Sequence, residues 1–307
     1  MALAPILLTA YNRPYHTKET IEALKLNELA KFSDFYIYLD GPNASKPDDP
    51  KKVNEISRYV NGLHGFKSIT IVENVSNKGL AENVITGVSA ILSKHKNIIV
   101  LEDDLVTQKY FLNVMNQMLD FYQNDARIGA VTAFMQTETL VKFPNSYKND
   151  VFFNVRPCST GWGTWLNRWE QVNWDIEGKE KFLADKTMQK QFNRGGNDLT
   201  QMLIKRIEGK IDSWAIRWSY HHFLKSLKTV QTTKSYIDNI GYDGLGINSK
   251  DESYYYRQNK MATKKSLDLQ QFDGHVDFNL IRRYTAPQSF GWAYIKRKLY
   301  SKLGIRL

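Results

Sequence analysis

Three consecutive acidic residues, Glu102, Asp103 and Asp104, follow the short apolar run 98–101. Such a run is typical of a buried strand, and open α/β sheets bind their ligands beyond the carboxyl ends of the strands. Carboxylates crowded at that edge repel one another and need a counter-charge. Mg²⁺ and Mn²⁺ usually bind one or two carboxylates together with the phosphates of a substrate. Taken alone, the triplet would favour a solvated acidic turn; its context favours a site for a metal-bound diphosphate.

Polar side chains also follow the other strands that we expect in the first third of the chain. The expected strands are 5–9, 34–39, 68–73 and 98–101, and the expected helices are 15–32, 51–63 and 80–94. Strands that alternate with helices indicate an α/β fold with a doubly wound, mostly parallel sheet. The turns after these strands carry Asn12 and Arg13, Asp40, Asn77 and Lys78, and the acidic triplet. Four polar turns at one sheet edge indicate a ligand crevice.

The remainder of the chain is rich in aromatic residues and reads as a continuation of the same globule. The expected helices are 109–124, 180–194, 199–208 and 211–227, and the expected strands are 129–134, 151–155 and 230–236, the last at a sheet edge. A segment rich in Gly and Trp covers 157–169, a Gly-rich loop covers 239–248, and a polar stretch covers 250–265. We expect three units, 1–110, 111–250 and 251–307.

Composition limits the class of partner and the compartment. The 307 residues include 42 Lys and Arg against 32 Asp and Glu, a formal charge of +10 that suits an anionic partner. We expect no nucleic acid, because zinc-finger spacing, RNP-like motifs and basic heptads are missing. Cys158 is the only cysteine, which excludes an intramolecular disulfide and fits a reducing compartment. The first residues lack a signal-peptide pattern, and no apolar run approaches about 20 residues, so we expect a cytoplasmic protein, soluble or peripheral.

Eight short motifs, in order along residues 5–249, resemble those of GT-A-type glycosyltransferases. They are LLTAYNR (7–13), YLDG (38–41), NKGLA (77–81), VLEDDL (100–105), AVTAF (130–134), GWGTW (161–165), IDSW (211–214) and NIGYDGLG (239–246). The chain looks close to the family-2-like bacterial sugar transferases and also resembles the animal N-acetylglucosaminyltransferase I group. The resemblance implies a GT-A, Rossmann-like fold. Residues 1–110 would then bind the nucleotide-sugar, 111–250 would form an aromatic-rich acceptor-binding and catalytic unit, and 251–307 would be a mobile loop and tail.

The resemblance also implies roles in the donor site. Asp104 matches the last acid of the family's metal-binding triplet and would bind Mn²⁺ or Mg²⁺ that bridges the donor diphosphate. Glu102 and Asp103 would face the ribose and the water shell of the metal. Asp40 matches an acceptor for the donor base, and a carboxylate accepts the N3–H of uracil, which cytosine lacks, so a UDP-sugar is favoured. The alternative is that Asp40 is an ordinary Asp-Gly turn residue.

Further donor contacts are expected from Ala10, Arg13, Lys78, Gly161 and Trp162. Arg13 could fork onto a phosphate or the base, and Lys78 could place a point charge near the diphosphate, although both types are also common on surfaces. Gly161 lies in a segment that resembles the loop beneath the donor sugar, where glycine allows a close approach of the backbone. Of Trp162 and Trp165, we expect one to stack on the sugar and the other to pack in a hydrophobic corner.

Asp212 is the candidate catalytic base. It lies at an expected helix N-terminus, and an inverting transfer needs one carboxylate to take the proton of the acceptor hydroxyl while a metal stabilises the departing diphosphate. Asp is also a common helix N-cap. Related animal enzymes carry two adjacent acids where this chain has Asp212 and Ser213, so the identity of the base stays open. Asn248 stands where related chains often have a histidine, which leaves open whether Asn248 or a His completes the metal site.

Residues 291–307 carry five basic residues and no acid, with an apolar stripe at helical spacing. This pattern is typical of a helix that lies on an anionic membrane, although an ordinary packed terminal helix is the alternative. The sequence therefore predicts a metal-dependent, inverting hexosyl- or N-acetylhexosaminyltransferase, with a retaining enzyme as the variant. It would use a UDP-sugar and a glycan or lipid-linked acceptor in bacterial surface polysaccharide synthesis, at the inner face of the plasma membrane.

Two other classes stay open. A nucleotidyltransferase shares the sheet and the carboxylate–metal chemistry, but it usually opens with a Gly-rich phosphate loop that segment 7–13 does not supply. A non-catalytic carbohydrate-binding or scaffold protein could keep the fold and lose the chemistry.

Overall fold

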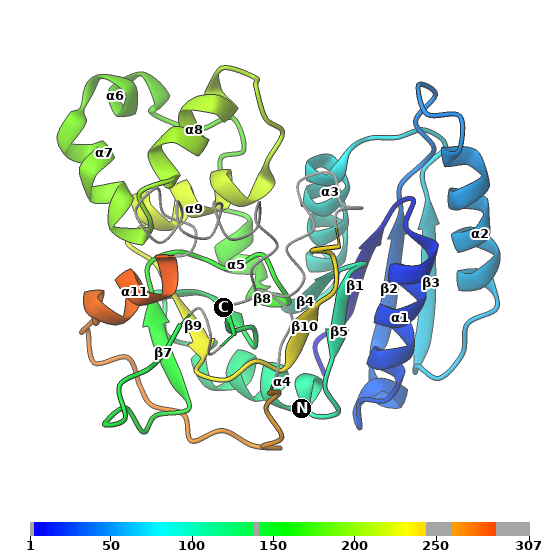
Figure 1. Ribbon diagram of the computed structural model, residues 1–307, viewed down its shortest axis with the longest axis horizontal. Coiled ribbons are helices and arrows are strands. Elements are labelled where there is room, and N and C mark those ends of the chain that lie inside the picture. Colours follow the sequence, from blue (N-terminus) through cyan, green and yellow to red (C-terminus); the bar gives the residue numbers. More distant parts are fainter. Residues whose placement is uncertain (1–2, 138–140, 244–259, 287–307) are drawn as a thin grey trace, which may run out of the picture.

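The computed structural model describes residues 3–137, 141–243 and 260–286, in which an eight-stranded sheet is flanked by helices (Figure 1). The strand order is β3-β2-β1-β4-β8-β6-β9-β7. The strands are β1 (Ile6–Ala10), β2 (Asp34–Leu39), β3 (Ser68–Glu73), β4 (Asn97–Glu102), β5 (Leu105–Thr107), β6 (Ile128–Thr132), β7 (Val151–Asn154), β8 (Trp162–Trp165), β9 (Lys228–Thr232) and β10 (Ile237–Asn239). The helices are α1 (Pro14–Lys25), α2 (Asp49–Asn61), α3 (Leu80–Leu92), α4 (Phe111–Tyr122), α5 (Leu166–Trp169), α6 (Lys179–Ala184), α7 (Lys186–Phe192), α8 (Leu199–Ile207), α9 (Trp214–Leu224) and α11 (Phe278–Thr285).

The first half of the sheet is the parallel, doubly wound arrangement expected from the sequence. β1 pairs in parallel with β2 and β4, and β2 pairs in parallel with β3. Because successive side chains of a strand point to opposite faces, Ile6 and Leu8 of β1 pack on α1, α2 and α4, whereas Leu7 packs on α3. Helices therefore cover both faces, which explains why every residue of β1 is buried. The carboxyl ends of these strands meet at one edge.

The second half continues the same sheet in a way that the sequence did not predict. The segment 161–165, for which the resemblance implied a loop, contains β8, which lies antiparallel between β4 and β6. β9 is parallel to β6 and antiparallel to β7, so the expected edge strand is an interior one and β7 forms the edge. β5 and β10 form a separate antiparallel pair. Since β4 pairs with β8, the sheet is continuous across the expected unit boundary at residue 110.

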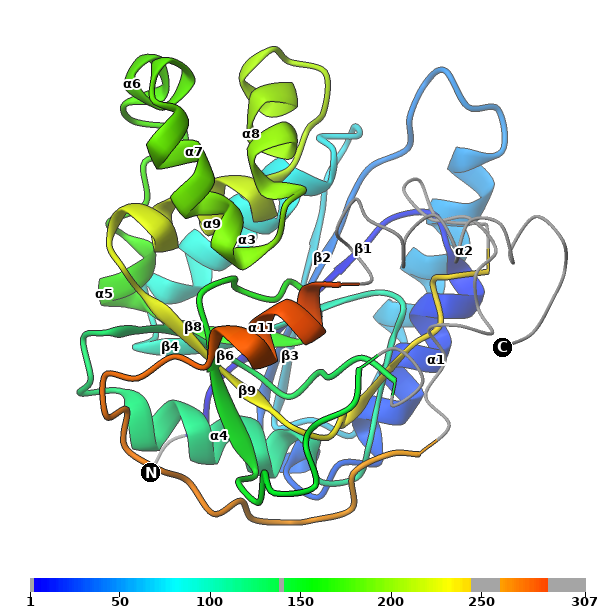
Figure 2. The ribbon, with the colours of Figure 1, turned by 60° about the vertical axis from the view of Figure 1, so that its left-hand side comes forward.

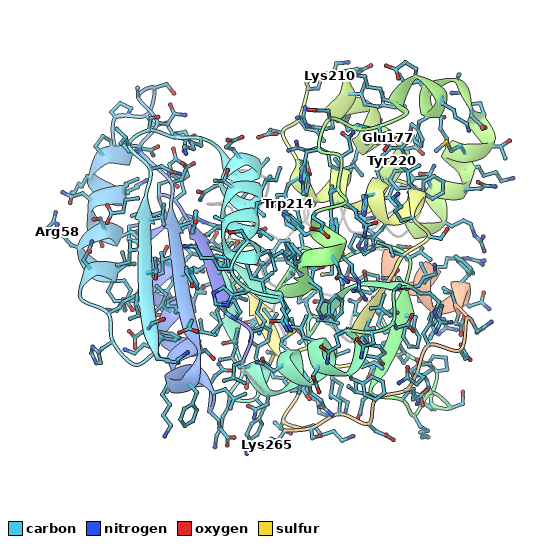
Figure 3. All side chains as sticks on the ribbon, turned by 180° about the vertical axis from the view of Figure 1, so that it is seen from behind. Arg58, Glu177, Lys210, Trp214, Tyr220 and Lys265 are labelled. Carbon is cyan, nitrogen blue, oxygen red and sulfur yellow. The ribbon has the colours of Figure 1, made fainter. Side chains whose placement is uncertain are left out.

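Helices α6 to α9 pack together beyond one end of the sheet (Figure 2). The expected helix 180–194 is interrupted at Asp185, whose backbone is extended and whose carboxylate accepts the backbone N–H of Met188 at 2.9 Å, which starts α7. α9 also contacts α3, and Trp214 lies on the side of α9 toward α3 (Figure 3). Within the described ranges, none of the helices is long and apolar enough to span a membrane. The expected basic helix 291–307 falls outside them.

Candidate nucleotide and metal site

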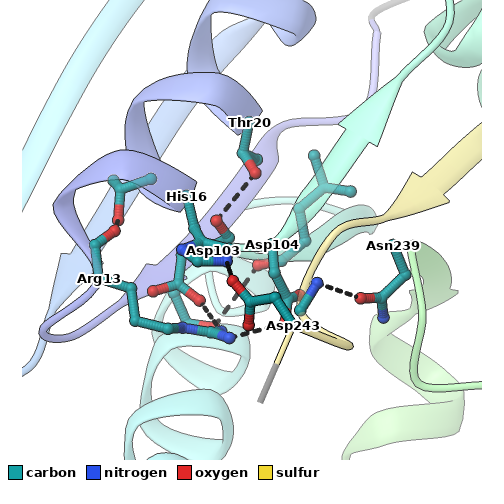
Figure 4. Close-up of polar contacts among 11 residues, drawn as sticks. Arg13, His16, Thr20, Asp103, Asp104, Asn239 and Asp243 are labelled. Atoms are coloured by element: carbon teal, nitrogen blue, oxygen red, sulfur yellow. Dashed lines mark hydrogen bonds and ion pairs between the residues drawn. The ribbon is translucent and has the colours of Figure 1, made fainter. Parts of the chain in front are cut away.

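The acidic triplet lies where β4 ends and β5 begins, at the carboxyl edge of the parallel strands. Figure 4 shows that Asp103 and Asp104 both point toward the guanidinium of Arg13. Arg13 Nη1 donates to Asp104 Oδ2 at 2.9 Å, and Nη2 donates to Asp103 Oδ1. The side chain of Arg13 is 19% exposed, and those of the two acids are 6% and 13% exposed. The structure therefore brings together residues that are ninety positions apart, as one partly buried cluster.

Burial and charge together perturb the titration of this cluster. Burial, helped by the neighbouring charge of Asp104, raises the pKa of Glu102 to about 8, so that this carboxyl is mostly neutral at pH 7. Burial also raises the pKa of Asp103, and the charge of Arg13 opposes that shift. Burial by itself would lower the pKa of Arg13, but its two carboxylate partners outweigh that effect and raise it. The cluster thus holds a permanent cation against adjacent acids.

Helix α1 fixes the backbone that carries Arg13. Arg13 is the N-cap of α1, Pro14 occupies the first turn, and the backbone N–H and hydroxyl of Thr17 both donate to the carbonyl of Arg13, at 3.0 and 2.9 Å. The hydroxyl of Thr20 donates to the carbonyl of Asp103 at 2.9 Å. The start of α1 and the acidic triplet are therefore tied together, while the long side chain of Arg13 keeps its own rotatable bonds.

The β10 segment covers the other side of Asp104. The backbone N–H of Ile240 donates to the carbonyl of Asp104 at 2.9 Å. A Cβ atom on Gly241 would lie 2.0 Å from Asp104 Oδ2, so only glycine fits against this carboxylate. Next to it, His16 Nε2 lies 2.9 Å from Asp243 Oδ2 (Figure 4). The sequence analysis did not single out His16 or Asp243, and Asn248 lies outside the described residues.

Asp103 and Asp104 offer carboxylate oxygens, which are the ligands that a hard divalent cation prefers. In the part of the chain that the structure describes, no group of three or more His, Cys, Asp or Glu side chains is arranged around one metal position. A pair of carboxylates is nevertheless the usual protein contribution to a Mg²⁺ site whose remaining ligands are phosphates and water. The oxygen-only donor set fits such an ion, but Arg13 already occupies one oxygen of each acid.

Asp40 organises the loop that follows β3. Its two oxygens accept five hydrogen bonds, from the backbone N–H groups of Gly41, Lys78 and Gly79 and from the side-chain amides of Asn74 and Asn77, at 2.8–3.2 Å. The side chain is buried. A carboxylate has about four lone-pair directions, so these donors fill it. Of the other expected contacts, Lys78 reaches Asp40 through its backbone N–H, and Ala10 is buried with its carbonyl accepting the N–H of Asp40.

Asp212 lies beside this loop, close to Gly79. A Cβ on Gly79 would lie 3.7 Å from Asp212 Oδ2, and Gly79 has a φ of +84°. The helix N-cap of α9 is Ser213, whose hydroxyl accepts the backbone N–H of Ile216, so Asp212 is not the cap. Its side chain is 59% exposed, and Oδ1 lies 3.7 Å from Arg217 Nη2 and 3.9 Å from Arg206 Nε. Asp212 is therefore an accessible carboxylate held between two cations.

The expected sugar-facing role of Trp162 is wrong. Trp162 is 1% exposed and stacks on Trp214 at a centroid distance of 5.0 Å, within a cluster that includes Trp169 and Trp218. Trp165 is also buried, and its Nε1 donates to a backbone carbonyl. Neither indole presents a face to a ligand, because Trp162 is 1% and Trp165 4% exposed. At Gly161, whose φ is +53°, a Cβ would lie 2.0 Å from Ile237 Cδ1, so packing on β10 explains this glycine.

Asp49 is a site residue that the sequence analysis missed. Its carboxylate accepts from the hydroxyl of Tyr11, from the side-chain amide of Asn12 at 2.6 Å and from the backbone N–H of Asn43 at 3.1 Å. It thereby joins the turn after β1 to the turn after β2. The sequence signal for Asp49 was its place directly before Pro50 at a helix start. This pattern is also common at helix starts that have no role in binding.

Comparisons with known proteins find a likeness only among solved structures. No family model matches the chain, and no curated protein matches it. The similar structures include TarS residues 1–349 from S. aureus (TM-score 0.44, 11% identity, 76% of this chain and 59% of that one). They also include the mannosyltransferase PcManGT from Pyrobaculum calidifontis, in complex with GDP-Man and Mn²⁺ (0.38, 11%, 71% and 68%). A third is a putative glucose-1-phosphate thymidylyltransferase from Bacillus anthracis (0.39, 10%, 78% and 89%).

The chain spans about three fifths of the length of that TarS fragment. At these identities and TM-scores the likeness carries no information on activity.

Proposed function

We propose that this chain is a glycosyltransferase that takes a sugar from a nucleotide-diphosphate sugar. One observation carries the proposal: the accessible carboxylate of Asp212 faces the same strand-end edge as the Asp103–Asp104 pair, and it is free of helix capping. Transfer from such a donor needs a cationic site for the diphosphate and a separate base for the acceptor. Asp103 and Asp104 with a bound divalent ion would supply the first, and Asp212 the second.

The roles follow from the contacts. Asp103 and Asp104 would hold a divalent ion, which when bound stabilises the negative charge of the departing diphosphate. Asp212 would take the proton of the acceptor hydroxyl as that oxygen attacks the sugar, in an inverting transfer. Arg206 and Arg217 lie 3.9 and 3.7 Å from Asp212 Oδ1 and flank this carboxylate. The choice of a UDP-sugar comes from the motif around Asp40 alone, because the five donors already fill that carboxylate.

A glycan or lipid-linked acceptor of a bacterial surface polysaccharide fits the net charge of +10, which would draw the protein toward anionic partners. Peripheral contact with the inner face of the plasma membrane is part of the same proposal. The transferred group would be a hexose or an N-acetylhexosamine.

Calorimetry with UDP, GDP, CDP and dTDP, with and without Mn²⁺, tests the donor site. Wild type should bind UDP in a metal-dependent manner, and Asp104→Asn should lose that dependence. Asp120→Asn, at a half-buried acid of α4, is the matched control. A folded wild type that binds none of the four nucleotides would rule out this function and favour a non-catalytic role.

Release of UDP from a panel of UDP-sugars tests the catalytic assignment. Asp212→Asn should retain nucleotide binding and lose about 10²–10⁴-fold in turnover, the usual effect of removing a general base. Turnover that survives in Asp212→Asn would exclude Asp212 as the base.

A further inference from the structure

The position of Arg13 raises a conflict between two cations. A guanidinium that bridges Asp103 and Asp104 neutralises the acids that a divalent ion would need. Both oxygens that it contacts, Asp103 Oδ1 and Asp104 Oδ2, are in the partly buried cluster, where charges are only weakly screened by solvent. A metal ion on Asp104 and the guanidinium on the same carboxylate would therefore repel each other.

From this geometry we infer that Arg13 is the resident counter-ion of the Asp103–Asp104 pair, and that it leaves the pair for the diphosphate when metal and nucleotide bind together. The inference deepens the proposed function and rests on it for the diphosphate. Divalent metal alone should bind weakly, because it must displace Arg13 into solvent. A nucleoside diphosphate changes this balance, since it gives the displaced guanidinium two phosphates to bind.

The surroundings of Arg13 allow the exchange. The backbone is held by Thr17 and Pro14, so the pivot is fixed, while the side chain is 19% exposed and borders solvent. Arg13 sits at the N-terminus of α1, where the helix dipole disfavours a cation, and no acid lies in the first turn to compensate. Its attachment therefore depends on Asp103 and Asp104, and an incoming diphosphate would offer an anion at the favourable end of the helix.

Thermodynamic coupling is the measurable consequence. Because each ligand removes an obstacle to the other, UDP should raise the affinity for Mn²⁺ in wild type, and Mn²⁺ should raise the affinity for UDP by the same factor. We expect about tenfold, within the roughly 5–150-fold range of such couplings.

The experiment is a titration of Mn²⁺, followed by electron paramagnetic resonance of the free ion, into wild type and Arg13→Gln with and without UDP. Without UDP, Arg13→Gln should bind Mn²⁺ about tenfold more tightly than wild type, and UDP should add less to its affinity. Arg127→Gln removes an exposed arginine paired with Asp125 and is the control for the change in net charge. Arg13→Lys keeps one charge but cannot fork across two acids, and it serves if Arg13→Gln fails to fold.

The outcomes separate the two proposals. Equal Mn²⁺ affinity of wild type and both Arg13 variants without UDP would overturn the counter-ion role. An equal effect of UDP on wild type and on Arg13→Gln would overturn the exchange. A gain of Mn²⁺ affinity in Arg13→Gln, in a protein that binds no nucleotide at all, would support Arg13 as counter-ion and refute the nucleotide-sugar function.

Discussion

Replacing Asp40 by Asn distinguishes a residue that reads a base from one that holds a loop. The substitution keeps the shape of the side chain but turns one acceptor oxygen into a donor. If the amide nitrogen takes the place of Oδ2, the part-buried N–H of Gly79 loses its acceptor, and the side chain of Asn77 must turn away. If it takes the place of Oδ1, the N–H groups of Gly41 and Lys78 are the ones affected.

The magnitude follows from these contacts. An unsatisfied buried donor costs about 1–3 kcal/mol, and each bond that remains weakens when its acceptor becomes neutral, from about 1.5–3 to about 1 kcal/mol. We expect Asp40→Asn to lower the free energy of unfolding by about 3 kcal/mol. Asp34→Asn, at the opposite end of β2, removes a carboxylate bonded to Ser68 and Lys67 near the surface and should cost less than about 1 kcal/mol.

Urea unfolding at pH 7.5 measures the stability, and calorimetry at 25 °C measures UDP and CDP binding to the folded fraction. If Asp40 holds the loop, Asp40→Asn should lower the urea midpoint with an unchanged m-value and lose affinity for both nucleotides in parallel. If Asp40 binds the base of the donor, Asp40→Asn should leave the urea midpoint unchanged and shift the preference toward CDP, because the amide of Asn can donate to N3 of cytosine. An unchanged midpoint together with that shift would refute the reasoning from the five donors.

Three other perturbations have defined outcomes. Gly241→Ala places a Cβ against the carboxylate of Asp104 and should weaken Mn²⁺-dependent UDP binding at least tenfold. An unchanged affinity for UDP would show that the segment after β10 does not border the site. Trp162→Ala should lower the free energy of unfolding by about 3–5 kcal/mol in urea, and a folded variant that loses only UDP-sugar binding would restore a sugar-facing role. Burial, aided by Lys225, lowers the pKa of His221 to about 4, so the unfolded chain takes up the proton first and stability falls as pH drops from about 6.5 toward 4. The loss from pH 8 to pH 5 is about 2 kcal/mol, and His221→Gln should remove that part of the pH dependence in urea unfolding.

The parallel half of the fold could be predicted because each element there carries its own local signal. Strands β1 and β4 are short apolar runs at the expected positions, since helices cover both faces there and burial leaves little room for polar residues. Strands β2 and β3 also lie where they were expected, and β3 at the sheet edge is partly exposed. The polar turns that follow these strands predicted which edge of the sheet carries the polar residues. In the structure, Asp40, Gly79, Asp103 and Asp104 lie at that edge.

The other half depended on contacts between distant segments. β8 contains two Trp and a Gly in a segment for which the resemblance implied a loop, but the structure places all four residues inside the sheet beside β4. β5 and β10 are three residues each and form only by pairing with one another across more than a hundred positions. A strand so short has no periodicity of its own to detect. The sequence shows Gly161 and Gly241, but it does not show that Ile237 packs against the first and Asp104 against the second.

The difference between local sequence signals and contacts made by folding also applies to the chemistry of the site. The sequence suggested that Arg13 binds a phosphate or the base, and the family resemblance suggested that Asp40 binds the base. In the folded chain each already has partners: Arg13 has two acids, and Asp40 has five donors. A ligand must compete with these contacts, so the binding free energy of each residue is a difference between two sets of bonds. Asp40 would give up buried bonds that hold a loop, whereas Arg13 would exchange one pair of anions for another. On this ground Arg13 is the better candidate for a residue that changes partner during the reaction, and Asp40 for one that keeps its partners throughout.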